Sequence, residues 1–514
     1  MAHIVKTSFG WIRGVQEGRV LAFRGIPYAQ PPIGPLRFRP PHKPLAWSGV
    51  RDAGSYGPAP MQVGSPVSAQ MGLAPPEVHE DCLSLNIWTP AADDAQRPVL
   101  VWLYGGAWVT GAGSLPLYNG ARLAARGEVV VVTLNYRLGL FGFLRGTGVC
   151  GDALNTTGNE GLLDQIAALE WVRDEIAGFG GDPQNVTVWG QSAGARSAAL
   201  LTVMPRARGL VHKVIQQSGG LALRQTLTSA DGVMHRLLKA MGLTPAQADR
   251  LREVPAATLL DLQQRLTPRT GGHFYGPVAD GELIPTDPFE AVATGASRGI
   301  PLLCGTNLDE MKFFRALDPA VEGLDNAGLL DRCRTLVAQV GHAERVLETY
   351  RAARLARGAE TSATELWFAL ASDHTYRTPI MRQAEQHAAH TPATYAYLFT
   401  WRSPAQSGRL GAAHCMEIPF VFGRLDDPGM GSFTGQGSAV QQLSEQMMDA
   451  WIAFARTGNP ATAALPVWPA YTANRRTTMV FDESVTVVDA PMEAERAIWT
   501  SVQKAEQGPG ADRQ

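Results

Sequence analysis

The chain has 514 residues, a length typical of two or three domains or of one large α/β enzyme with insertions. Its 45 Lys and Arg residues nearly balance 47 Asp and Glu residues, and no Lys/Arg-rich run indicates a surface that binds nucleic acid. No run of about 18 apolar residues predicts a membrane span, and the first residues lack the apolar region of a signal peptide. We therefore expect a cytoplasmic protein that binds neither nucleic acid nor membrane.

The cysteines are few and scattered along the chain. An odd number without a C-x-x-C pair argues against a disulfide framework and against a metal site. We expect free and mostly buried thiols. The five are Cys82, Cys150, Cys304, Cys333 and Cys415.

Pro and Gly crowd residues 20–60, with aromatic residues between them, which predicts irregular structure wrapped over a surface. From residue 98 onward, short apolar runs rich in β-branched and aromatic residues predict buried strands. These runs lie at residues 98–103, 128–137, 185–192, 300–307 and 393–401. Because such strands are apolar on both faces, they favour a mainly parallel sheet covered by helices.

Helical patterns separate the predicted strands. Residues 159–183 place Leu162, Ile166, Leu169 and Val172 on one face at helical spacing. Residues 225–270 and 320–390 are predicted to be largely helical insertions. Alternating strands and helices indicate an α/β fold. The composition of residues 504–514 predicts a disordered tail.

The pattern G-x-S-x-G, which can mark a nucleophilic serine, occurs twice, around Ser192 and around Ser297. A nucleophile elbow requires this pattern at a sharp turn from a strand to a helix. Ser192 follows a predicted strand and precedes a helical run, whose N-terminus offers N–H groups and a positive dipole end. Ser297 has the reverse context, between a helix and a strand. The sequence favours Ser192 as the nucleophile and Ser297 as a polar loop residue.

An acyl-transfer nucleophile also needs N–H groups where the carbonyl oxygen becomes negative. The N–H of Ala193 is one candidate, and a glycine-rich loop after an earlier strand should supply another. The stretch "VWLYGGAWVTGAG" leaves such a strand and contains Gly105, Gly106 and Ala107. A turn without a ligand and a phosphate loop are the alternatives, although the stretch lacks both G-K-[ST] and G-x-G-x-x-G. Together with Ser192, it favours an oxyanion hole.

Several further motifs occur in the order of a known family. They include "FRGIPYAQPPIGPLRF", "EDCLSLNIWTP", "VVVVTLNYRLGLFGFL", "VTVWGQSAG", "GTNLDE", "HCMEIPFVFG" and "WIAFARTGNP". In these motifs the chain resembles the type-B carboxylesterases, which include bacterial p-nitrobenzyl esterases, animal carboxylesterases and cholinesterases. The resemblance implies an α/β-hydrolase fold with helical insertions around the active site, built as a single domain over residues 1–500.

The resemblance also implies the rest of a catalytic triad. Glu310 in "TNLDEMKFF" matches the family's acid, and His414 in "AAHCMEIPF" matches its base. The order nucleophile, acid, base agrees with this fold. The residues alone do not choose Glu310 over Asp309, nor His414 over His374 or His273.

Other roles follow only from the resemblance. The oxyanion donors it implies are Gly106, Ala107 and Ala193. The groups it implies as supporting the triad are Ser218 and Glu417. It implies two structural ion pairs, Arg37 with Glu80 and Arg137 with Asp164, and it requires neither metal nor cofactor.

The chain departs from the family pattern near the site. Gln191 stands where many members have Glu, so a negative charge beside the nucleophile is missing. Met311 and Cys415 each replace a common glycine next to a triad position. Cys82 has no preceding cysteine to pair with, and the stretch before it has no tryptophan to bind a cation. These departures favour a general intracellular carboxylesterase over a choline esterase.

The sequence thus predicts a bacterial serine esterase that cleaves small-molecule carboxylic esters through an acyl-enzyme on Ser192. A carbamate or amide hydrolase, or a lipase, would use the same residues with a different pocket. A binding protein without activity is the alternative from another class, since adhesion members of the family have lost the triad. The sequence predicts neither the natural substrate nor the oligomeric state.

Overall fold

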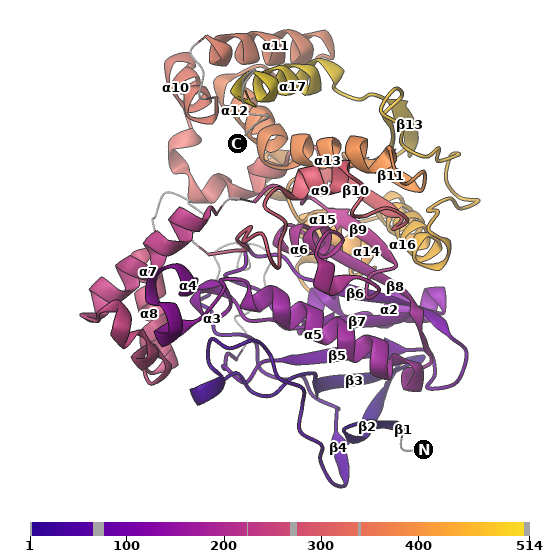
Figure 1. Cartoon of the computed structure of the whole chain (residues 1–514). Coiled ribbons are helices and arrows are strands. Elements are labelled where there is room, and N and C mark those ends of the chain that lie inside the picture. Colours follow the sequence, from indigo (N-terminus) through magenta and orange to yellow (C-terminus); the bar gives the residue numbers. More distant parts are fainter. Residues whose placement is uncertain (1–2, 65–76, 224, 268–274, 338–340, 508–514) are drawn as a thin grey trace.

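We analysed a computed structural model of the chain, which describes residues 3–64, 77–223, 225–267, 275–337 and 341–507. One large twisted sheet runs through the molecule, with helices on both sides (Figure 1). Its strand order is β1-β2-β3-β5-β7-β6-β8-β9-β10-β11-β12-β13, and β4 pairs with β2 outside this path. The α/β-hydrolase architecture predicted from the sequence is therefore confirmed.

The strands have the following bounds. They are β1 (His3–Thr7), β2 (Gly10–Glu17), β3 (Val20–Pro27), β4 (Val50–Asp52), β5 (Ser84–Thr89), β6 (Arg97–Leu103), β7 (Val130–Leu134), β8 (Gly181–Gln191), β9 (Lys213–Gln217), β10 (Leu302–Asn307), β11 (Thr394–Phe399), β12 (Thr477–Phe481) and β13 (Thr486–Asp489). From β7 to β12 every neighbouring pair is parallel, whereas β1, β2, β3, β5 and β13 join by antiparallel pairing. The parallel strands carry the buried apolar runs, as the sequence predicts.

The helices fill the segments between strands. They are α2 (Ala121–Gly127), α3 (Gly139–Phe143), α4 (Thr147–Cys150), α5 (Glu160–Glu175), α6 (Ala193–Leu201), α7 (Leu227–Met241), α8 (Ala256–Leu266), α9 (Pro288–Ala293), α10 (Asn326–Leu336), α11 (His342–Ala356), α12 (Ala363–Ser372), α13 (Thr378–Ala388), α14 (Ile418–Val421), α15 (Met430–Thr434), α16 (Ser438–Thr457) and α17 (Glu493–Gln507). The insertions predicted at 225–270 and 320–390 supply α7, α8 and α10 to α13. In the part of the chain that the structure describes, no helix combines the length and the apolar character that a membrane span needs.

Helices cover both faces of the parallel strands. In β8, Trp189 stacks on Phe422 with ring centroids 4.5 Å apart. A Cβ at the next residue, Gly190, would instead lie 2.5 Å from the backbone of Gly194 in α6. Because consecutive residues of a strand point to opposite faces, α6 and Phe422 lie on opposite sides of the sheet. Helix α6 is thus packed on one face of the sheet and the aromatic core on the other.

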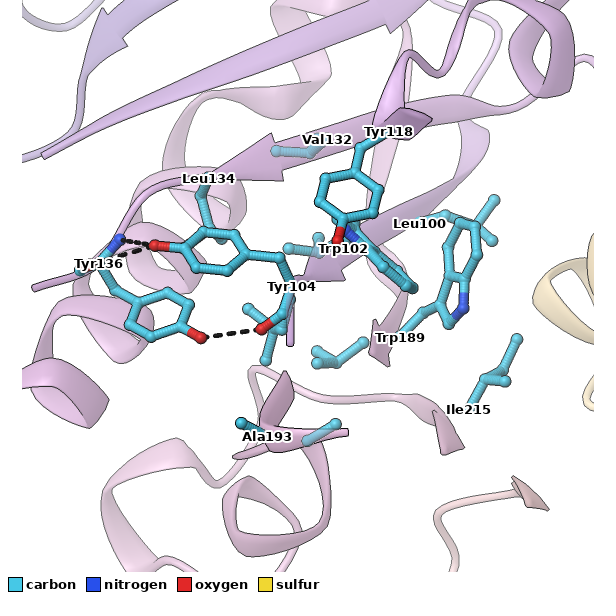
Figure 2. Close-up of a cluster of buried hydrophobic side chains, with 14 of the residues drawn as sticks. Leu100, Trp102, Tyr104, Tyr118, Val132, Leu134, Tyr136, Trp189, Ala193 and Ile215 are labelled. Atoms are coloured by element: carbon cyan, nitrogen blue, oxygen red, sulfur yellow. Dashed lines mark hydrogen bonds between the residues drawn. The ribbon is translucent and has the colours of Figure 1, made fainter. Parts of the chain in front are cut away.

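Figure 2 shows part of the buried core, around the central strands β6, β7 and β8. Trp102 of β6 and Trp189 of β8 are fully buried, with ring centroids 4.6 Å apart. Beside them Tyr104 and Tyr136 stack at 4.5 Å. The Tyr136 hydroxyl donates to the Tyr104 carbonyl at 2.8 Å, and the Tyr104 hydroxyl donates to the Tyr136 carbonyl at 3.3 Å. This reciprocal pair fixes the backbone where the glycine-rich loop begins.

Two predictions about the chain's ends need correction. Residues 20–60 are not irregular throughout, because Val20–Pro27 forms β3 between β2 and β5. The apolar residues at its start, Val20 to Phe23, pack into the core, and this outweighs the glycines and prolines around them. Helix α17 continues through residue 507, so residues 504–507 are helical rather than part of a disordered tail. Residues 508–514 lie outside the described part.

Both predicted ion pairs are present and buried. Arg137 Nη2 lies 2.7 Å from Asp164 Oδ1, and Asp164 is fully buried. Arg37 Nη2 lies 2.5 Å from Glu80 Oε2, where both side chains are about nine-tenths buried. The Arg137 pair joins the segment after β7 to helix α5, so it fixes the framework around the central strands.

Replacing Asp164 with Ala should cost about 3–5 kcal/mol of unfolding free energy, because it leaves the Arg137 guanidinium buried without its carboxylate. The matched control is Asp261→Ala in α8, where the pair with Arg265 at 2.7 Å is more than half exposed. Loss of that exposed pair should cost less than about 0.5 kcal/mol. Urea unfolding of the three proteins measures both values, and equal losses in the two variants would contradict a structural role for the buried pair.

Candidate active site

The parallel strands bring the predicted site residues to one edge of the sheet. The glycine-rich loop follows β6, Ser192 follows β8, Ser218 follows β9 and Glu310 follows β10, while His414 lies on the segment after β11. The chain adds β7 on one side of β6 and then β8 on the other. Sites in open α/β sheets form outside the carboxyl ends of strands at such a reversal.

Ser192 occupies the sharp turn between β8 and α6. Its φ of 56° and ψ of −122° lie outside the ordinary regions for a residue with a side chain. The neighbouring backbone leaves no room for side chains, since a Cβ at Gly194 would lie 1.9 Å from the Leu103 carbonyl oxygen. A Cβ at Gly219 would lie 2.3 Å from the Ser192 carbonyl oxygen. The G-x-S-x-G glycines are therefore required by close backbone approach, and the serine is left partly exposed.

The glycine-rich loop lies against this turn. A Cβ at Gly105 would lie 2.9 Å from the Cβ of Ser192. Gly106 and Ala107 both have positive φ, of 117° and 55°. Within the described residues, the N–H groups of Gly106, Ala107 and Ala193 donate to no protein acceptor. These three amides are thus available to an incoming oxygen atom.

Glu310 and His414 are hydrogen-bonded in the buried part of the site. His414 Nδ1 lies 2.5 Å from Glu310 Oε2, and the two side chains have exposed fractions of only 3% and 0%. The other oxygen, Glu310 Oε1, accepts the N–H of Asn307 at 2.8 Å. A proton on Nδ1 directed at the carboxylate leaves Nε2 as the basic nitrogen of the ring.

The hydroxyl of Ser192 makes no hydrogen bond with His414 among the described residues. Instead the Gln191 side-chain nitrogen lies 3.0 Å from His414 Nε2 and 3.5 Å from Nδ1. The Gln191 amide is thus a hydrogen-bonding neighbour of His414 at Nε2. Catalytic hydrogen bonds in unliganded sites are often completed only when substrate binds.

The alternatives that the sequence left open have other partners. Asp309 forms an ion pair with Lys312 at 3.1 Å and accepts the N–H of Ala412 at 3.1 Å. The His374 ring packs on Trp499 of α17, with ring centroids 5.1 Å apart. Ser297 is 2% exposed in the loop between α9 and β10. His273 lies outside the described residues.

A second buried carboxyl group lies behind Glu310. Glu417 accepts hydrogen bonds from Asn307 Nδ2 at 2.6 Å and from Gln217 Nε2 at 3.0 Å. Burial raises the pKa of Glu417, and the nearby charge of Glu310 raises it further. The Ser218 hydroxyl is buried and has no hydrogen-bond partner among the described residues.

Two of the departures from the family pattern have local consequences. Cys415 has a φ of 69°, a left-handed conformation that a glycine adopts more easily. Burial raises the pKa of its thiol, with the Glu417 and Glu310 charges adding to the effect, so it is a poor nucleophile. The N–H of Met311 donates to Ser372 Oγ at 3.0 Å, which ties the Glu310 turn to helix α12.

Sequence reasoning missed Asn307, whose N–H binds Glu310 and whose amide binds Glu417. Its place two residues before Asp309 in the motif "GTNLDE" was the available signal. It also missed Tyr376, whose ring lies on His414, and no pattern indicated it. In the described part of the chain, no cluster of three or more His, Cys, Asp or Glu is placed to hold a metal ion.

The Gly194→Ala variant should lose at least about 3 kcal/mol of unfolding free energy, because the new methyl group would overlap the Leu103 carbonyl. Gly232→Ala, in helix α7, is the matched control, since its Cβ would meet nothing nearer than 3.6 Å. That control should gain about 0.5–1 kcal/mol, as expected for Gly→Ala inside a helix. Chemical denaturation measures the unfolding free energy of both variants. A Gly194→Ala protein as stable as the wild type would contradict the close approach of strand and helix.

Comparison with known proteins agrees with this geometry. The chain is 38% identical over 504 residues to para-nitrobenzyl esterase of Bacillus subtilis, covering 96% of this chain and 98% of that protein. It is 36% identical over 490 residues to phenmedipham hydrolase of Pseudarthrobacter oxydans, covering 92% and 93%. A carboxylesterase of Geobacillus stearothermophilus superposes with a TM-score of 0.87 at 40% identity, covering 97% of this chain and all of that one.

The sequence also matches the model of the carboxylesterase family over residues 1–499. The resemblance inferred from the motifs is therefore confirmed across nearly the whole chain. The protein belongs to the carboxylesterase family and is a carboxylic ester hydrolase.

Proposed function

We propose that Ser192 is the nucleophile of this hydrolase, with His414 as its general base and Glu310 as the acid that orients the base. The observation that carries the proposal is the buried hydrogen bond of 2.5 Å between His414 Nδ1 and Glu310 Oε2. It stands beside a serine held in a strained turn at the start of α6. Backbone strain of this kind persists at sites where function requires it.

In the reaction, His414 Nε2 takes the proton of the Ser192 hydroxyl as the oxygen attacks the ester carbonyl. Glu310 holds the ring in the tautomer with Nδ1 protonated and stabilises the positive charge that the ring then carries. His414 returns the proton to the departing alcohol, which leaves an acyl group on Ser192. Water enters, loses a proton to His414 and attacks the acyl-enzyme, which releases the acid and restores the serine.

The negative oxygen of each tetrahedral intermediate binds to backbone amides. We assign this role to Gly106, Ala107 and Ala193, whose N–H groups have no acceptor among the described residues and line the turn at Ser192. One such donor is worth about 3 kcal/mol of transition-state stabilisation. The position of Ala193 at the N-terminus of α6 adds the positive end of a helix dipole.

Glu417 and Ser218 are proposed as supporting groups, because the Glu417 carboxyl lies behind Glu310 and shares Asn307 with it.

We further propose that residues 1–500 act as one catalytic domain, which the family match over residues 1–499 supports. A cytoplasmic location is supported by the five free cysteines. The substrate class is a small-molecule ester, as the names of the esterase relatives suggest.

The test is the initial rate of hydrolysis of p-nitrophenyl butanoate by the wild type and by Ser192→Ala. The variant should lose activity by about 10⁴-fold or more, because removal of the nucleophile abolishes the acyl-enzyme route. Ser297→Ala is the matched control, since Ser297 is the centre of the second G-x-S-x-G, and its rate should equal that of the wild type. Circular dichroism checks that each variant is folded.

A folded Ser192→Ala enzyme with the wild-type rate would overturn the assignment of the nucleophile. A series of acyl chain lengths, together with matched carbamate and amide substrates, then separates an esterase from the other hydrolases that share this triad.

A further inference from the structure

A short π-helical turn interrupts the long helix above the site. Residues Asp373–Arg377 form this π-turn between α12 and α13, which lie together at the top of Figure 1. The N–H of Thr378 donates to the carbonyl of Asp373, five residues earlier. Pro379 follows and has no N–H, so the carbonyl of Thr375 cannot receive the usual helical hydrogen bond. Such turns are rare and often occur at functional sites.

The freed carbonyl is used by the helix that follows the nucleophile. Arg196 Nη2 donates to the Thr375 carbonyl oxygen at 3.1 Å, and its Nη1 donates to the Ala222 carbonyl oxygen at 2.7 Å. Arg196 lies four residues after Ser192, in the first turns of α6. The π-turn is therefore tied by a charged hydrogen bond to the helix that begins at the nucleophile.

The same region also contacts the acid and the base. Ser372, directly before the π-turn, accepts the N–H of Met311 at 3.0 Å, next to Glu310. Within the turn, Tyr376 lies on the imidazole of His414, with ring centroids 4.6 Å apart and planes inclined by 35°. The π-turn thus contacts the elements that carry all three members of the triad.

The far side of the turn is anchored in a separate hydrophobic cluster. Asp373 accepts the hydroxyl hydrogen of Tyr350 and pairs with Arg377. Tyr350 in turn accepts Trp499 Nε1–H of α17 at 2.7 Å. All four side chains are largely buried, so the turn, and with it the ring of Tyr376, is held in one arrangement.

We propose that Tyr376 is a positioning residue for His414, held in place by the π-turn, and that its ring face stabilises the charged imidazole formed during the reaction. The inference rests on the function proposed above. The aromatic face carries the effect, because a ring centroid within about 6 Å attracts a cation through its quadrupole. The hydroxyl group of Tyr376 is not required for this role.

The test compares Tyr376→Phe, which keeps the ring, with Tyr376→Leu, which removes it. Tyr376→Met, a longer apolar side chain, serves as a second ring-free variant and fills more of the space if the Leu variant does not fold. Phe368→Leu is the matched control, because Phe368 is a buried aromatic of α12 whose described ring contact is with Arg315 and not with His414. All are assayed with p-nitrophenyl butanoate across pH, beside Ser192→Ala.

The ring-free variants should lose about tenfold in kcat with little change in KM. The acid limb of their kcat/KM profile should move to lower pH by about half a unit to one unit, because the protonated ring is less stable without the aromatic face. The Glu310 carboxylate beside the ring is unchanged in every variant. Tyr376→Phe and Phe368→Leu should match the wild type in both measurements.

Wild-type kcat and pH profile in a folded ring-free variant would overturn the inference, and so would an effect on KM alone. An equal loss of kcat in Tyr376→Phe would also overturn the inference, because the hydroxyl would then be the important group. Failure of the proposed function is distinguishable, because it would appear as activity in Ser192→Ala whatever the Tyr376 variants do.

Discussion

The site depends on one close approach of backbone atoms, where strand β8 turns into helix α6. A Cβ at Gly190 would meet Gly194, and a Cβ at Gly194 would meet the carbonyl of Leu103 in the neighbouring strand β6. Because no side chain separates these segments, the helix N-terminus, the glycine-rich loop after β6 and the serine between them come within van der Waals distance. The same contact places beside Ser192 three amides that have no acceptor among the described residues.

The second constraint is the burial of two carboxyl groups in adjacent positions. Glu310 and Glu417 are both fully buried, and their mutual repulsion contributes to the raised pKa of Glu417. Asn307 lies between them, giving its backbone N–H to Glu310 and its side-chain amide to Glu417. Hydrogen bonds of this kind offset the cost of burying charge, and they leave Glu310 free to hold His414. The electrostatic surroundings of His414 thus include buried groups that it does not itself contact.

The sequence predicted the fold and much of the candidate site because both depend on local patterns. Apolar runs marked the parallel strands, and the strand–G-x-S-x-G–helix context separated Ser192 from Ser297. The resemblance supplied Glu310 and His414, which are 104 residues apart in sequence and carry no pairing signal of their own. Strand β3 was missed because the glycines and prolines around it outweighed a short apolar run, which is placed by antiparallel pairing with β2 and β5.

Other features could not be predicted, because they depend on contacts between distant segments. The position of Tyr376 on His414 follows from the π-turn that precedes Pro379 and from Arg196, more than 170 residues earlier, which donates to the freed carbonyl. The contact of the Gln191 amide with His414 likewise depends on how the end of β8 and the segment after β11 meet. The donors to Glu417, Gln217 and Asn307, also come from two different strand ends.

The most direct measurement is the mass of the acylated peptide after rapid acid quenching of the enzyme during turnover of p-nitrophenyl butanoate. The account predicts one butanoyl group, located by fragmentation on Ser192, formed as fast as the first p-nitrophenol is released. Acylation at another residue, such as Ser297 or Cys415, or turnover with no acylated peptide, would contradict the assignment of Ser192 as the nucleophile.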